Sequence, residues 1–135
     1  MIIIGHPLLE SAEFVCVERV EEIERVEARC VVFFESRELE ASLALAKHCH
    51  AHGVTYAVVV QELEAFLLHA SLSPAYLIVP KLAQAQAFQK IAEQYLLDSK
   101  LLCVIKSSKQ MAKVAESGID GVIFKQVLGS IRALI

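Results

Sequence analysis

Short apolar runs alternate with longer amphipathic segments along most of the chain. Five such runs occupy residues 31–34, 56–60, 75–79, 101–105 and 121–124, and each is rich in β-branched or aromatic side chains. Continuous apolar runs of this length predict strands buried on both faces, as in a parallel sheet covered by helices. Their starts lie 19 to 26 residues apart, which suits repeated strand–helix units with right-handed crossovers. We therefore predict the order βαβαβαβαβα for residues 31–135.

The segments between these runs have the period of amphipathic helices. Ser107 and Gln110 have the spacing of a capping box that opens a helix around Met111. Gly53 and Gly118 stand where helices are expected to end. Two apolar stripes predict buried helix faces: Leu82, Ala85, Phe88, Ile91, Ala92, Tyr95 and Leu96 form the first, and Leu39, Leu43, Ala46 and His50 form the second.

The first thirty residues follow this rhythm less closely. Residues 1–4 predict one strand and residues 14–17 predict another. A short glutamate-rich helix is expected around residues 20–26, where only Val20, Ile23 and Val26 are apolar. We interpret this part as a strand followed by a short acidic helix.

These patterns together predict an α/β fold in a single domain of residues 1–135. The expected architecture is an open, mostly parallel sheet of five to seven strands with helices on both faces, a flavodoxin-like or Rossmann-like three-layer sandwich. A closed (β/α)₈ barrel usually needs about 200 residues or more, so it is disfavoured for a chain of 135 residues. The order of the strands in the sheet does not follow from the pattern.

Composition adds an expectation about location. Hydrophobic residues make up 56% of the chain, above the ~45–50% that is typical of soluble domains. No run approaches the ~20 apolar residues of a membrane-spanning helix, and residues 1–5 lack the basic start of a secretion signal. The four cysteines include no C-x-x-C pair, which favours reduced thiols. We predict a cytoplasmic protein that does not bind a membrane.

Charge is distributed unevenly along the chain. The formal net charge is −3, but residues 1–41 hold ten glutamates and only four arginines, while all eight lysines follow residue 46. No stretch interleaves basic and aromatic side chains in the manner of a nucleic-acid-binding surface. We therefore expect no nucleic-acid partner.

The carboxyl ends of parallel strands are the expected place for a ligand, because helix N-termini gather at the same edge. The basic and hydroxyl side chains that follow predicted strands are Arg37, Lys81, Lys106, Ser107, Ser108 and Lys125. They predict an anion-binding rim centred on residues 106–108. Two observations oppose it: Ser107 already caps a helix, and the chain has no glycine-rich phosphate loop. No cofactor is expected.

A histidine cluster is the second candidate for chemistry. His48 and His52 are four residues apart on a predicted helix, so their rings could share a metal ion. They are weak candidates, because no neighbouring carboxylate completes a coordination shell and because the helix dipole alone favours histidine at a helix end. We predict no metal site. The catalytic residues stay unknown, since no nucleophile motif is present.

Three functions remain open, in this order. The first is a non-catalytic homo-oligomer, expected as a homodimer, or a partner-binding protein; the apolar excess favours it, and so does the apolar tail with Val127, Leu128, Ile131 and Leu134. The second is a binding protein or enzyme for a small anionic, phosphorylated metabolite at the carboxyl ends of the strands. The third is a metal-dependent function at residues 48–52.

Overall fold

The computed structural model describes residues 1–129, which contain seven strands and five α-helices. The strands are β1 (Ile2–Ile4), β2 (Phe14–Cys16), β3 (Val31–Glu35), β4 (Tyr56–Val59), β5 (Tyr76–Val79), β6 (Lys100–Ile105) and β7 (Gly121–Phe124). The α-helices are α1 (Val20–Ile23), α2 (Leu39–Ala51), α3 (Leu63–Ala70), α4 (Leu82–Gln94) and α5 (Met111–Glu116). Two 3₁₀ turns, η1 (Ser108–Gln110) and η2 (Lys125–Leu128), complete the order.

All seven strands form one open parallel sheet in the order β1-β7-β6-β5-β4-β3-β2. This confirms the predicted α/β class and the predicted parallel sheet. From β2 to β7 the chain always steps to the next position in the same direction, and only β1 is placed at the far edge. Right-handed crossovers that all step one way carry their helices across the same face of the sheet.

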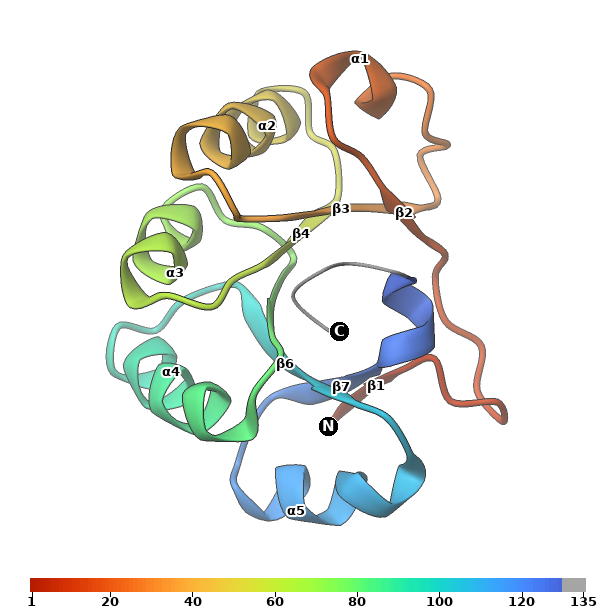
Figure 1. Cartoon of the computed structure of the whole chain (residues 1–135), viewed down its shortest axis with the longest axis vertical. Coiled ribbons are helices and arrows are strands. Elements are labelled where there is room, and N and C mark those ends of the chain that lie inside the picture. The colour runs from red at the N-terminus through yellow and green to blue at the C-terminus, as the bar shows by residue number, and fades with distance from the viewer. Residues whose placement is uncertain (130–135) are drawn as a thin grey trace.

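The sheet curls, so its two faces differ (Figure 1). The α-helices lie around the convex face, and η2 lies inside the curl against the concave face. Helical elements therefore cover both faces, five α-helices on one and a single 3₁₀ turn on the other. Because all seven strands are parallel, their carboxyl ends lie at the same end of the curl, which we call its mouth.

Two apolar cores follow from the alternation of side chains along each strand. In β3, Val32 and Phe34 belong to the convex core beneath the helices, whereas Val31 and Phe33 belong to the concave core. Leu128 of η2 joins the concave core and is 2% exposed. Because both faces are buried, the strands have continuous apolar sequences rather than alternating ones.

The first thirty residues and the capping box are arranged as the sequence predicted. β1, β2 and α1 lie within the segments expected for them. The side-chain oxygen of Gln110 accepts hydrogen bonds from the backbone N–H groups of Lys106 and Ser107 at 2.6 and 3.3 Å. This cap opens η1, and α5 follows it directly.

The predicted helix stripes were partly wrong. Helix α4 ends at Gln94, and Leu96 adopts a φ of 51°, so Tyr95 and Leu96 leave the buried stripe and are 67% and 84% exposed. In α2 the buried face consists of Ser42, Leu45, Ala46 and Cys49, and His50 is exposed. In α2 the error arises because a polar residue, Ser42, occupies a core position. Of the apolar tail residues named above, Ile131 and Leu134 lie outside the described residues.

Candidate functional site

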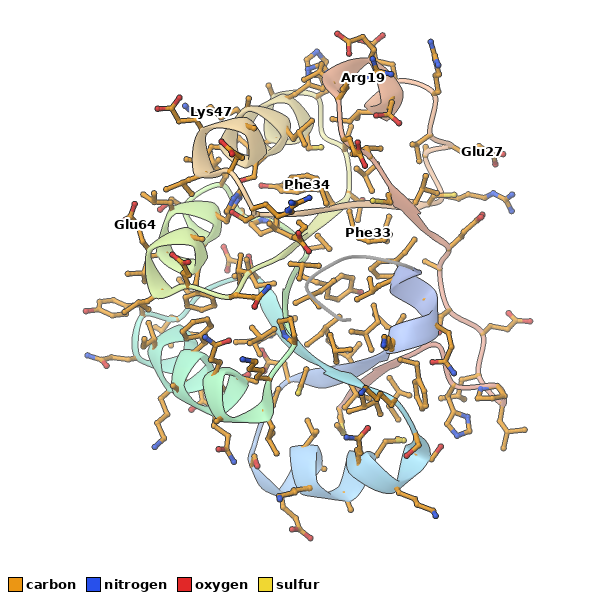
Figure 2. The ribbon with its side chains drawn as sticks, in the orientation of Figure 1. Arg19, Glu27, Phe33, Phe34, Lys47 and Glu64 are labelled. Carbon is orange, nitrogen blue, oxygen red and sulfur yellow. The ribbon has the colours of Figure 1, made fainter. Side chains whose placement is uncertain are left out.

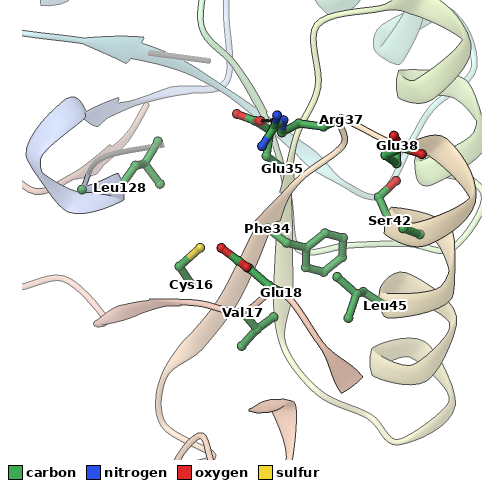
Figure 3. A pocket seen from close by; sticks show the side chains of 12 residues that line it. Cys16, Val17, Glu18, Phe34, Glu35, Arg37, Glu38, Ser42, Leu45 and Leu128 are labelled. Atoms are coloured by element: carbon green, nitrogen blue, oxygen red, sulfur yellow. Dashed lines mark ion pairs between the residues drawn. The ribbon is translucent and has the colours of Figure 1, made fainter. Parts of the chain in front are cut away.

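The described residues form a cleft of about 1020 Å³ at the carboxyl ends of β2 and β3 (Figure 3). These strands are neighbours in the sheet, and α2 begins a few residues after β3, so three chain segments meet there. Leu128 and Gly129 contribute from the other end of the chain. The lining residues are Cys16, Val17, Glu18, Phe34, Glu35, Arg37, Glu38, Ala41, Ser42, Leu45, Leu128 and Gly129.

Both charged and apolar side chains line this cleft. Arg37 pairs with Glu35 at a distance of 3.3 Å between Nε and Oε1. The Glu35 side chain is only 10% exposed, whereas that of Arg37 is 58% exposed. Glu18 and Glu38 are exposed to solvent. The cleft is therefore lined by more carboxylates than cations among the described residues.

Cys16, the cysteine that lines the cleft, lies in surroundings that favour its thiol form. Burial raises the pKa of Cys16, and the carboxylates of Glu18, Glu22 and Glu35 raise it further. A reactive cysteine needs the opposite surroundings, a positive charge that stabilises the thiolate. The surroundings of Cys16 therefore disfavour the thiolate that nucleophilic chemistry requires.

Behind the cleft wall, a chain of polar side chains runs from the sheet edge into the space between α2 and α3. Ser42 Oγ lies 2.9 Å from Ser36 Oγ and 2.9 Å from Nε2 of the buried His69. Ser42 also donates to the backbone carbonyl of Leu39 at 3.1 Å. The Ser42 hydroxyl has a single proton, which it donates to that carbonyl. Its oxygen therefore accepts hydrogen bonds from the Ser36 hydroxyl and from the Nε2–H group of His69.

This serine–histidine contact resembles a catalytic pair in distance only. Burial lowers the pKa of His69 to about 4, far below the value near neutrality that suits a general base. Its Nδ1 atom is buried and finds no hydrogen-bond partner within the part of the chain described here. A third group that would orient the ring is thus missing from the pair. The arrangement supports a structural role.

The predicted anion-binding residues are divided between this cleft and the rest of the sheet edge. Arg37 lines the cleft. The others follow β5, β6 and β7, which are adjacent strands: Lys81 precedes α4, Lys106 follows β6, Ser107 and Ser108 begin η1, and Lys125 begins η2. They share the predicted edge but do not line the cleft, and Gln110 occupies the N–H groups of Lys106 and Ser107. The phosphate site stays a prediction.

The histidine cluster is arranged for stacking. The rings of His48 and His52 lie face to face with centroids 4.1 Å apart, and Nδ1 of His52 lies 2.8 Å from the carbonyl oxygen of His48. Across residues 1–129, no group of three or more histidine, cysteine or acidic side chains is placed to hold a metal ion.

Sequence reasoning missed most of the cleft. Cys16 ends β2 and Glu18 follows it, just as Glu35 ends β3 and Arg37 follows it. The rule that selects strand ends would therefore have found Cys16 and Glu18 once residues 14–17 were taken as a neighbour of β3. Ser42 gave no signal, because a serine in a helix is ordinarily a surface residue. Leu128 reaches the cleft from a distant part of the sequence.

Comparison with known protein families gave no match, and comparison with curated protein sequences gave none either. No helix in residues 1–129 combines the length and the apolarity that a membrane crossing requires.

Proposed function

We propose that this protein binds a small organic molecule in the cleft at the carboxyl ends of β2 and β3. The observation that carries the proposal is the cleft itself, with a volume of about 1020 Å³. Small-molecule sites typically have volumes of ~300–1,000 Å³, and in parallel α/β sheets they lie beyond the carboxyl ends of the strands. Both the size and the position agree with such a site.

The lining favours a neutral or positively charged ligand with an apolar part. Phe34, Leu45 and Leu128 supply apolar surface, while Glu18 and Glu38 offer exposed carboxylates beside a single arginine. A phosphorylated metabolite would meet repulsion from these carboxylates at close range. The weakly basic His69 and the thiol form of Cys16 speak for binding without catalysis.

A cytoplasmic location is part of the same proposal. All four cysteines are free, and Cys30, Cys49 and Cys103 are buried as thiols. Unpaired buried thiols are typical of proteins in reducing compartments.

Filling the cleft tests the proposal. Ala41 lines the cleft and Ala44 is exposed on the same helix without lining it, so Ala41→Phe and Ala44→Phe form a matched pair. The probes are 2-phenylethylamine, 2-phenylethanol and phenylacetate, which differ mainly in charge. A probe at ten times its Kd should stabilise the wild-type chain by about 1.4 kcal/mol, which is a rise in Tm of about 3–6 °C.

We expect the amine or the alcohol to raise the Tm of the wild-type chain and of Ala44→Phe, and to leave Ala41→Phe unchanged. Phenylacetate should have the smallest effect. An equal shift in the two variants would place binding outside the cleft and contradict the proposal. A shift from phenylacetate alone would contradict the inferred charge of the ligand.

A further inference from the structure

The outer side of α3 differs from that of every other helix in the described chain. Four of its residues are exposed, and three of them are leucines: Leu63, Leu67 and Leu68 are 47%, 43% and 40% exposed. The fourth is Glu64. The opposite side of the helix, with Ala65, Phe66 and His69, is buried against the rest of the molecule. Helix α3 is thus apolar on both sides.

The other helices follow the usual rule for a water-facing surface. Every exposed residue of α2, α4 and α5 is either an alanine or a polar residue. The remaining large exposed apolar side chains lie outside helices: Met1 is at the chain start, Leu8 and Leu9 are in the loop after β1, and Tyr95 and Leu96 follow α4. Three leucines on an eight-residue helix therefore form a local apolar surface, of the kind that marks an association site.

We propose that this leucine surface, Leu63, Leu67 and Leu68, binds a second copy of the chain in a two-fold dimer. An isologous contact places the same surface on both sides, so leucines of one copy meet leucines of the other. The proposal is independent of the ligand cleft, which lies at the strand ends and shares no residue with α3.

Charges beside the leucines are complementary to a second copy of the same surface and favour one orientation for it. Glu64 stands near the beginning of α3. Ser42 of α2 meets His69, which lies near the end of α3. The two helices run in the same direction because both connect parallel strands, so the exposed Lys47, further along α2, is nearer to the end of α3 than to its beginning. Figure 2 shows Lys47 and Glu64 pointing outward from the two helices, away from the sheet. The two opposite charges therefore lie toward opposite ends of the leucine surface.

A two-fold axis perpendicular to α3 exchanges these ends. It brings Glu64 of one copy toward Lys47 of the other, twice in the same dimer. An axis parallel to α3 would instead keep the acidic beginnings of the two helices together, where like charges repel. We therefore infer that the two α3 helices pack antiparallel, with Leu67 and Leu68 at the centre.

The first experiment measures self-association by sedimentation equilibrium over protein concentrations from about 1 μM to about 1 mM. The wild-type chain should show a reversible monomer–dimer equilibrium. Leu67→Asp should weaken it at least tenfold, while the matched control Leu96→Asp, which removes a more exposed leucine, should leave it unchanged. Circular dichroism verifies that both variants are folded. A wild-type monomer across the range, or equal effects of the two variants, would overturn the proposal.

The second experiment tests the orientation by exchanging charges. Glu64→Lys and Lys47→Glu should each weaken the dimer, because each places like charges opposite one another. The double variant should restore association to within about threefold of wild type. Restoration cannot arise from the separate loss of two surface charges, so a double variant as weak as the singles would overturn the antiparallel arrangement.

Discussion

At the scale of single residues, His69 is the least expected feature of the core. It is fully buried between α2 and α3, and its ring lies near Phe34 with centroids 6.2 Å apart. Its Nε2 contacts Ser42, but its Nδ1 has no partner among the described residues. Burial without a charged partner favours the neutral ring. No pattern in the sequence predicts a buried histidine at this position, and the histidines considered there for chemistry were His48 and His52.

His69 should make the protein less stable in mild acid. Its pKa is about 4 when folded and about 6.5 when unfolded, so between these values the unfolded chain binds a proton that the folded chain does not. The free energy of unfolding should therefore be highest above pH 6.5 and fall as the pH decreases toward 4. The loss attributable to His69 at pH 5 is about 2 kcal/mol.

Urea unfolding at pH 7.5 and pH 5 measures this effect. His69→Gln keeps a polar partner for Ser42 but removes the titrating ring, so its stability should change less between the two values. His50→Gln, at an exposed position, should behave like the wild-type chain. If His69→Gln and the wild-type chain lost the same stability in acid, other groups would account for the loss.

At the scale of elements, the strands were predictable and the faces of the helices were less so. A strand that is buried on both faces can be predicted from a short run of consecutive apolar residues, as in β4 and β6. A helix face depends on which neighbours cover it. Ser42 is polar but buried, and Leu67 is apolar but exposed. A buried helix face that is predicted from polarity alone therefore places both residues on the wrong side. The cleft combines strand ends with η2, and no local pattern links those segments.

Gly121 shows how closely two of these elements approach. It begins β7 opposite Ile2 of β1, and a Cβ atom there would stand 2.5 Å from the Ile2 carbonyl oxygen and 2.8 Å from Leu102 Cδ2. A backbone atom cannot move aside as a flexible side chain can. Gly121→Ala should therefore reduce the free energy of unfolding by about 3 kcal/mol.

The control is Gly118→Ala, where open space surrounds the glycine but φ is 75°. That variant should lose only about 1 kcal/mol from backbone strain. Denaturant unfolding of both variants gives the ranking. A smaller loss at Gly121 than at Gly118 would mean that β1 separates from β7 at little energetic cost.

For the complete sheet, the order of the strands could not be predicted from the pattern of apolar runs. The runs at residues 31–124 indicate parallel strands, but a sheet that reverses direction after its first strands and a sheet that steps steadily one way have the same local sequences. Steady stepping decides what covers each face: the α-helices take the convex side, and η2 with Leu128 closes the concave side. The mouth of the curl, and with it the cleft, is a product of that order.

The position of β1 has a consequence for how the chain reaches this state. Strands β2 to β7 each pair with the strand made just before or after them, so they can assemble progressively during synthesis, with short loops to close at each step. β1 is synthesised first, yet its sole neighbour in the sheet is β7. During synthesis, β1 cannot pair in the sheet until residues 121–124 have left the ribosome. Pairing β1 with β7 also joins the two strands that are farthest apart in the sequence, which is slow in refolding of the full chain as well. In pulse-labelling hydrogen exchange during refolding, the amides of β1 should therefore become protected last; early protection there would contradict late pairing of β1.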